Sequence, residues 1–208
     1  MSLLLEACAL RHVYADGSIG LDDCTLAIRP GSRNALLGSN GSGKTTLLQH
    51  FNALLRPTDG QVRFAGQPVD YGRAGLNALR HQVGLVFQNP DRQLFSASVI
   101  EDVSFGPLNL GLDEATVRQR VGQALAAVGM TDLADKPVHH LSFGQKKRVC
   151  IAGVLAMQPE LLLLDEPMAG MNVEEKQDMC RFILDVNDEF GTTIVLIEHD
   201  MGVVMDIS

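Results

Sequence analysis

The chain has 208 residues, 46% of them hydrophobic and 20% charged, with a formal net charge of −8 and a pI near 5.1. These values are typical of a globular protein that buries its own core, and the acidic balance argues against nucleic-acid binding by bulk charge. Apolar runs such as Leu161–Leu164 are too short to span a bilayer, and Met1–Leu10 lacks the features of a secretory signal. We therefore expect a cytosolic protein with four reduced, mostly buried thiols, which are those of Cys8, Cys24, Cys150 and Cys180.

Short apolar runs alternate with segments of helical periodicity along the chain, which is the pattern of an α/β sheet. We expect strands at Leu3–Leu10, Thr25–Ile28, Asn34–Leu37, Gln61–Ala65, Val83–Phe87, Leu161–Leu164 and Thr192–Ile197. The last two should be parallel, because the segment between them has an apolar helical face.

Helices are expected at Lys44–Leu55, Asp113–Val128 and from Ser142 to about Met157. Asp113 is placed to cap the second of these, and Gly129 lies where it should end. The stretch from Asn89 to Leu141 interrupts the strand–helix alternation, so we interpret it as an inserted helical subdomain.

A phosphate loop follows the third expected strand, since residues 38–45 read GSNGSGKT and fit the pattern G-x-x-x-x-G-K-[ST]. Glycines let successive backbone N–H groups converge on one anion, and the helix after the loop adds positive potential. Lys44 can reach the β- and γ-phosphates, and the Thr45 hydroxyl can hold Mg²⁺. The predicted phosphate-binding residues are Gly38, Ser39, Asn40, Gly41, Ser42, Gly43, Lys44, Thr45 and Thr46.

Two carboxylates, Asp165 and Glu166, come directly after the apolar strand Leu161–Leu164. In open α/β sheets this edge binds ligands. Asp165 suits a role at the metal, and Glu166 can polarise a water molecule for attack on the γ-phosphate. A solvated acidic turn before Pro167 is the alternative for the pair taken alone.

The pentapeptide 141–145, LSFGQ, carries Ser142 and Gln145 at the spacing of a capping box that opens a helix. A plain helix cap is the commoner meaning of that spacing. However, Gly144 leaves room for a phosphate at this helix start, and the longer sequence LSFGQKKR resembles the signature motif of ABC-type ATPases. This sequence departs from the signature motif at Phe143, a position where most members of the family carry glycine.

This resemblance implies roles for residues outside the motifs above. Tyr14 resembles the aromatic residue that stacks on adenine, although a half-buried strand tyrosine is the alternative. Gln88 resembles the glutamine that senses the γ-phosphate and the metal, and His199 resembles the switch histidine at the γ-phosphate. Asn172 stands where many members have aspartate, so it cannot act as an anionic partner across an interface.

The resemblance also implies the fold and the assembly. The fold would be a P-loop NTPase with a RecA-like mixed sheet core, an antiparallel β subdomain and a helical subdomain at about 89–141. Residues 1–208 would form one nucleotide-binding domain, shortened at its C-terminus because members continue past the switch histidine. Two such chains would close head to tail, with MgATP between one chain's phosphate loop and the other's Ser142, Gly144 and Gln145.

Within the family, the chain is most similar to energy-coupling-factor ATPases, especially those for cobalt and nickel uptake. This similarity lies in residues 86–112 and in the segment HHLSFGQKKRV. The implied partner is an integral membrane subunit, which places the chain on the cytoplasmic face of the membrane. The surface that binds the membrane partner would lie near Gln88–Phe105. Its mixed polar and apolar face would consist of Arg92, Gln93, Leu94 and Phe95. Alternatively, Leu94 and Phe95 belong to the subdomain core.

Other readings stay open at this point. Residues 168–208 resemble ATPases of branched-chain amino acid importers, so the chain is either an unusual lineage or a joining of two relatives near Asp165–Pro167. The alternative solutes are therefore a vitamin or a branched-chain amino acid. Phe143, Asn172 and the C-terminus also fit a nucleotide-binding domain with little turnover. An ABC protein of ribosomes or DNA is disfavoured by the length and the charge.

Overall fold

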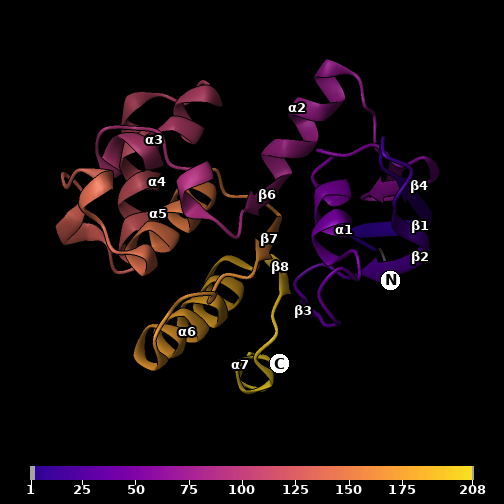
Figure 1. The fold of residues 1–208 in the computed structure, drawn as a ribbon. Coiled ribbons are helices and arrows are strands. Elements are labelled where there is room, and N and C mark those ends of the chain that lie inside the picture. Colours follow the sequence, from indigo (N-terminus) through magenta and orange to yellow (C-terminus); the bar gives the residue numbers. More distant parts are fainter. Residues whose placement is uncertain (1–2, 208) are drawn as a thin grey trace.

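A computed structural model describes residues 3–207 as two sheets with helices packed between and around them (Figure 1). The strands are β1 (Leu5–Val13), β2 (Ile19–Ile28), β3 (Arg33–Leu36), β4 (Asp59–Phe64), β5 (Gln67–Pro68), β6 (Val83–Val86), β7 (Leu161–Asp165) and β8 (Thr193–Ile197). The α-helices are α1 (Lys44–Phe51), α2 (Arg73–Gln82), α3 (Val99–Asn109), α4 (Glu114–Ala127), α5 (Phe143–Leu155), α6 (Val173–Phe190) and α7 (Met201–Asp206). Short 3₁₀ helices are η1 (Pro90–Arg92), η2 (Thr131–Leu133) and η3 (Val138–His140).

The central sheet has the strand order β3-β8-β7-β6, and all three of its pairings are parallel. Every residue of β7 and β8 is buried, as expected for strands predicted from unbroken apolar runs in the sequence. Alternate residues of β7 face opposite sides, so Leu162 and Leu164 pack with α5 and α6 while Leu161 and Leu163 pack with α1. The parallel strand–helix–strand unit predicted from the sequence is confirmed.

A second sheet, β2-β1-β4-β5, is antiparallel. Its inner residues Leu5, Leu10 and Ile28 bury against Leu48 and Phe51 of α1. Each such side chain contributes about 1.5–3 kcal/mol when it leaves water. Helix α1 is thus held between the two sheets, which fixes the helix start that follows the phosphate loop.

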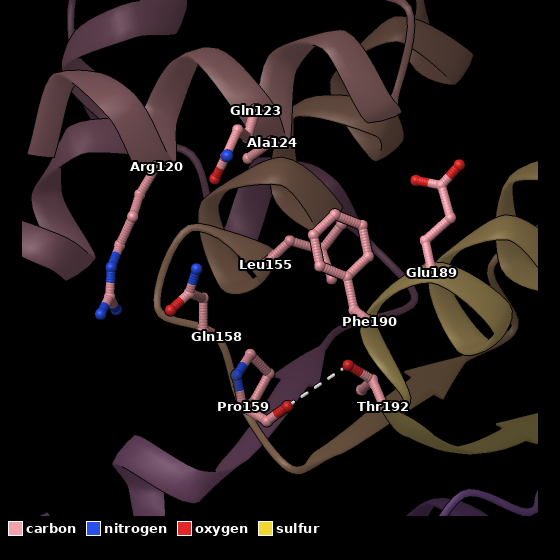
Figure 2. Close-up of a pocket in the computed structure, with 9 residues that line it drawn as sticks. All are labelled: Arg120, Gln123, Ala124, Leu155, Gln158, Pro159, Glu189, Phe190 and Thr192. Atoms are coloured by element: carbon pink, nitrogen blue, oxygen red, sulfur yellow. Dashed lines mark hydrogen bonds between the residues drawn. The ribbon is translucent and has the colours of Figure 1, made fainter. Parts of the chain in front are cut away.

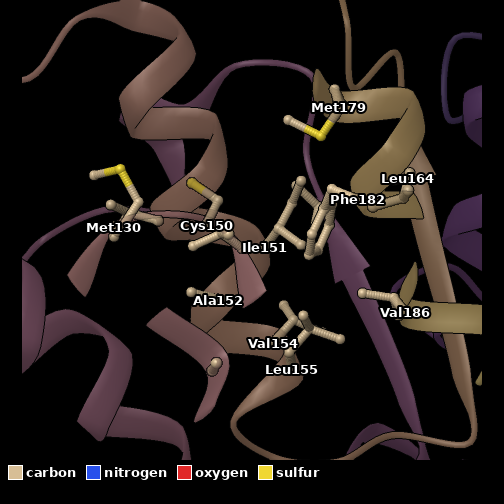
Figure 3. Packing of buried hydrophobic residues seen from close by; sticks show 14 of the residues in the cluster. Met130, Cys150, Ile151, Ala152, Val154, Leu155, Leu164, Met179, Phe182 and Val186 are labelled. Carbon is tan, nitrogen blue, oxygen red and sulfur yellow. The ribbon is translucent and has the colours of Figure 1, made fainter. Parts of the chain in front are cut away.

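Helices α3, α4 and α5 form the side of the molecule opposite the antiparallel sheet (Figure 1). Asp113 caps α4 by accepting from the backbone N–H of Thr116, and Gly129 follows the helix with a φ of 64°. Figure 3 shows Ile151 and Val154 of α5 among apolar side chains of the neighbouring elements. This packing sets α5 rigidly beside β7, with its first turn near the surface.

Several elements differ from the sequence prediction. Helix α1 ends at Phe51 rather than at Leu55, because Ala53 takes a left-handed φ of 52°. Helix α2 was not predicted, although Leu76 and Leu79 form an apolar face toward the core, because it is short, contains Gly75 and has no side-chain cap at its start. Two of the four thiols, Cys150 and Cys180, are buried, whereas the other two are half-buried. No helix among the described residues is long and apolar enough to cross a membrane.

Candidate nucleotide-binding and catalytic site

An open cleft of about 730 Å³ lies where the phosphate loop meets the carboxyl ends of the central strands. The β1–β2 hairpin forms one wall, and the start of α1 forms the floor. Its lining residues are Tyr14, Ile19, Gly20, Asn40, Gly41, Ser42, Gly43, Lys44, Thr45, Thr46, Gln88, Glu166 and His199. Residues spread over most of the chain therefore meet at the sheet edge that the sequence predicted.

The phosphate loop has the backbone that its glycines allow. Gly43 has a φ of 87°, and a Cβ atom there would collide with the carbonyl oxygen of Gly20 in the hairpin wall. The Lys44 ammonium donates to the carbonyl oxygens of Gly38 and Ser39 at 2.8 and 2.9 Å. The loop thus brings a cation and the N-terminus of α1 to the same point, which suits a polyphosphate.

Thr45 and Asp165 lie together beneath the cleft. The Thr45 hydroxyl donates to Oδ1 of Asp165 at 3.2 Å, and Asp165 is only 6% exposed. Burial raises the pKa of the Asp165 carboxyl above its ordinary value, while the Thr45 hydrogen bond opposes that shift. A hydroxyl and a carboxylate are oxygen ligands of the kind that Mg²⁺ takes alongside substrate phosphates and water, so these residues fit the ion.

Glu166 extends from the end of β7 with both carboxylate oxygens in contact with neighbours. Gln88 donates to Oε2 at 2.6 Å, and Nε2 of His199 lies 3.2 Å from Oε1. Glu166 has a φ of 46° although it precedes Pro167, a position where extended backbone is preferred. A carboxylate fixed in this way beside a phosphate loop can accept a proton from water.

Tyr14 stands in the hairpin wall with its ring 38% exposed. Its hydroxyl lies 2.7 Å from the Thr46 hydroxyl, and its ring meets His12 edge to face at a centroid distance of 4.6 Å. The ring also covers Gly20, where a Cβ atom would lie 2.7 Å from it. These contacts fix an aromatic face next to the phosphate loop, where a planar base can stack.

The signature residues lie elsewhere. Ser142 and Gln145 form the predicted capping box. The backbone N–H of Gln145 donates to the Ser142 hydroxyl at 3.2 Å, and the backbone N–H of Ser142 donates to the side-chain oxygen of Gln145 at 3.0 Å. Phe143 is 41% exposed and packs beside Gly170. Among residues 3–207, none of the signature lines the cleft. The start of α5 is therefore a second helix N-terminus, separate from the cleft; Ser142 is exposed there, whereas Gly144 is buried with the Glu175 carboxylate where its Cβ would lie.

Sequence reasoning missed Lys147, which is wholly buried. Its ammonium donates to the carbonyl oxygen of Glu166 at 2.9 Å and approaches that of Phe87 at 3.5 Å. Burial lowers the pKa of this lysine to about 8. No signal in the sequence could have found it, because a KKR run ordinarily indicates solvated surface charge.

Three further positions singled out in the sequence, Asn172, Leu94 and Phe95, lie outside the cleft. Asn172 caps α6, accepting from the N–H of Glu175 at 2.9 Å and donating its own N–H to the Glu175 carboxylate. Leu94 packs against the core, as the second alternative expected, whereas Phe95 is exposed and does not belong to the core.

A second cavity of about 360 Å³ lies between α4, the end of α5 and the end of α6 (Figure 2). Arg120 and Glu189 flank it, and Leu155 and Phe190 supply apolar walls. It contains none of the predicted nucleotide or catalytic residues, so the chemistry belongs to the cleft.

Comparison with known proteins agrees with this geometry. The family model described as ABC transporter matches residues 21–169. The energy-coupling factor transporter ATP-binding protein EcfA3 of Clostridium perfringens is 46% identical over 97% of this chain and 70% of its own length. The corresponding EcfA of Methanocaldococcus jannaschii is 48% identical over 97% of this chain and 72% of its own.

Two solved structures are also similar. One is cbiO1 of Clostridium perfringens, with a TM-score of 0.90, 46% identity, and coverage of 98% of this chain and 81% of that one. The other is the ATP-binding cassette MJ0796, solved as a dimer bound to ADP and Pi, with a TM-score of 0.88, 26% identity, and coverage of 98% and 91%. The chain belongs to the ABC transporter family, as the ATP-binding, ATP-hydrolysing subunit of an energy-coupling-factor type transporter.

Proposed function

We propose that this chain binds MgATP in the cleft and hydrolyses it with Glu166 as the general base. The observation that carries the proposal is the hydrogen-bonded group of Gln88, Glu166 and His199 at the mouth of the phosphate loop. Tyr14 would stack on adenine, and residues 38–46 would hold the phosphates, with Lys44 at the β- and γ-phosphates.

Thr45, Asp165 and Gln88 would hold Mg²⁺, which when bound neutralises charge on the β- and γ-phosphates. Glu166 would take the proton from the attacking water, while Gln88 and His199 contact the γ-phosphate and keep the carboxylate oriented. Within residues 3–207 no cluster of three His, Cys, Asp or Glu side chains could hold a metal ion, which is consistent with a site completed by the nucleotide itself.

We propose further that residues 1–208 act as one nucleotide-binding domain, with a helical subdomain at about 89–141, and that two chains share each ATP. Ser142, Gly144 and Gln145 would complete the site of the neighbouring chain. The start of α5 supports this arrangement, because it is a helix N-terminus with an exposed Ser142 that lies outside the chain's own cleft. The dimeric state of the similar cassette MJ0796 supports it as well.

The deciding experiment is the ATPase rate measured against protein concentration, with Glu166→Gln as the blank. A rate that rises faster than linearly, and is about 10²–10⁴-fold lower in the variant, is expected for a shared site with a Glu166 base. A variant that hydrolyses ATP at the parent rate would overturn the assignment of Glu166. A strictly linear parent rate at concentrations where size-exclusion chromatography shows the chain to be a monomer would overturn the shared site.

The membrane partner is proposed to bind an apolar groove of about 250 Å³ between α3 and α5. Phe95 is 64% exposed at this groove, and its ring meets that of Phe105 at a centroid distance of 4.7 Å. Gln93 links the groove to the cleft, because its side chain bonds both the N–H of Phe87 and the carbonyl of Cys150. Such a partner would hold the chain peripherally at the cytoplasmic face of the membrane.

Co-purification with the cognate membrane subunit tests this surface. Phe95→Ser should reduce recovery of the complex, whereas Phe190→Ser, at an exposed phenylalanine of α6, should not. Equal recovery with both variants would place the partner elsewhere.

The transported solute is proposed to be cobalt or nickel ion. The similarity of residues 86–112 to ATPases of that group supports this, as does the structural neighbour cbiO1, described as part of the transporter complex cbiONQ. Cells that express the chain with its membrane subunits should accumulate radioactive cobalt or nickel, and Glu166→Gln should abolish the uptake. Uptake of a vitamin or a branched-chain amino acid instead would overturn the choice of solute.

A further inference from the structure

Lys147 lies in the second turn of α5 and is fully buried, although it ends in an ammonium group. We infer that Lys147 is a positioning residue for ATP hydrolysis, which holds the backbone segments that carry Glu166 and Gln88. The inference rests on the proposed role of Glu166 as the general base.

The first contact is with the residue whose side chain would act as the base. The Lys147 ammonium donates to the Glu166 carbonyl oxygen at 2.9 Å, and the N–H of Ala169 reaches the same oxygen at 3.2 Å. Glu166 occupies left-handed backbone at a φ of 46° before a proline, which a glutamate adopts only when its surroundings hold it there. A donor fixed on the Glu166 carbonyl therefore fixes the direction of the Glu166 side chain as well.

The second contact is with the neighbouring strand end. The same ammonium lies 3.5 Å from the carbonyl oxygen of Phe87, and Phe87 directly precedes Gln88. Gln88 in turn donates to the Glu166 carboxylate at 2.6 Å. One amine thus contacts the backbone beside both members of this hydrogen bond, and a small displacement of either strand end would change its geometry.

Burial of this lysine is energetically unfavourable. Among the described residues, no carboxylate lies within 4.0 Å of its ammonium, which is satisfied by backbone carbonyls. Its neighbours Val149, Cys150 and Ile151 on α5 show that the helix otherwise buries apolar side chains here. A long apolar side chain would fill the same space without desolvating a charge. Lysine is distinguished at this position by the two backbone hydrogen bonds and by a cation–π contact, in which its ammonium lies 5.9 Å from the centroid of the Phe143 ring.

Three variants test the inference in the intact chain. Both substituted side chains end one bond short of the Lys147 nitrogen: Lys147→Met removes the donor, whereas Lys147→Gln keeps an N–H donor. Lys146→Met is the matched control, because Lys146 lies on the same helix and its ammonium pairs with Asp91 at 2.7 Å rather than with the site. For each protein, ATP affinity is measured without turnover and kcat by phosphate release, with circular dichroism to verify folding.

We expect kcat of Lys147→Met to fall about 10-fold or more while the Kd for ATP stays within about 3-fold, because only the geometry of the base is lost. Lys147→Gln should be intermediate, about 3-fold below the parent, and Lys146→Met should match the parent. In a Glu166→Gln background, Lys147→Met should cause no further loss, since both act through one group. An undiminished kcat in folded Lys147→Met, or additive losses in the double variant, would overturn the inference.

If Lys147→Met does not fold, Lys147→Leu takes its place as the variant without a donor, and a kcat equal to that of the parent in the folded protein would contradict positioning by Lys147. Parent activity no higher than that of Glu166→Gln would instead overturn the proposed function, together with the inference. If the parent is active and the Lys147 variants have the same kcat as the parent, only the inference is overturned, so the two failures are distinguishable.

Discussion

Gln88 and Glu166 are joined directly, by a 2.6 Å hydrogen bond from Nε2 of the glutamine to Oε2 of the glutamate. The parallel register of β6 and β7 produces this contact, since Val86 pairs with Leu164 and each side chain of the hydrogen bond lies two residues further on. Neighbouring parallel strands end at the same edge of a sheet, so residues distant in sequence meet there.

Changes at Gln88 should therefore disturb the orientation of Glu166, in addition to any contact that Gln88 makes with Mg²⁺ and the γ-phosphate. Gln88→Ala removes the donor, and we expect kcat to fall about 10-fold. Gln88→Glu should lower it further, because a second carboxylate would repel that of Glu166. Steady-state ATPase assays at neutral pH check both values, and a Gln88→Glu protein as active as Gln88→Ala would contradict the argument.

Tyr14 offers a test of base recognition. Tyr14→Ala should raise the Kd for ATP about 10-fold, as expected when a stacking contact worth about 1–3 kcal/mol is lost. Tyr14→Phe keeps the ring and loses only the contact with the Thr46 hydroxyl, so it should stay within about 3-fold of the parent.

Pyrophosphate is the control ligand for Tyr14, because it lacks a base. Its affinity should be unchanged in Tyr14→Ala. An equal loss for ATP and pyrophosphate in competition binding would show that Tyr14 acts on the phosphate loop through Thr46 instead.

Asn172 should matter for stability, since it forms a capping box with Glu175 at the start of α6. Asn172→Ala removes the acceptor for the Glu175 N–H and should lower the free energy of unfolding by about 1 kcal/mol. Asn172→Asp keeps an acceptor and should be as stable as the parent. Urea unfolding of the three proteins measures the difference, and equal stability of the alanine and aspartate variants would rule out a capping role.

The burial of Lys147 leads us to expect a specific dependence of the free energy of unfolding on pH. Its pKa is lowered from 10.5 to about 8 in the folded protein. Between these values the unfolded chain keeps a proton that the folded protein has lost, so the folded state gains stability as the pH rises. Below pH 8 both states are protonated, and the cost of burying the charge is constant.

The measurement is a difference between two proteins. The free energy of unfolding of the parent minus that of Lys147→Met should increase by up to about 3 kcal/mol between pH 8 and 10.5. Taking the difference cancels the groups that both proteins share, and Lys146→Met gives the baseline. A flat difference across this range would mean that Lys147 is as solvated in the folded protein as in the unfolded chain.

Local features were predictable because they depend on neighbouring residues. The phosphate loop, the caps by Asp113 and Ser142, and the buried strands Leu161–Leu164 and Thr192–Ile197 each follow from turn chemistry, capping or apolar periodicity within a few residues. Helix α2 escaped notice because its apolar face consists of only Leu76 and Leu79 and no capping side chain marks its start.

The sequence by itself determined the family, and it predicted the nucleotide and the reactive groups, because these are encoded in short motifs whose spacing fixes their local geometry. Only the tertiary structure decided which groups touch one another. The bonds of Glu166 to Gln88 and His199, and the burial of Lys147 under the Glu166 carbonyl, depend on strand register and on the packing of α5. Burial converts a lysine of an apparently solvated KKR run into a fixed donor, and no local pattern records burial of that kind.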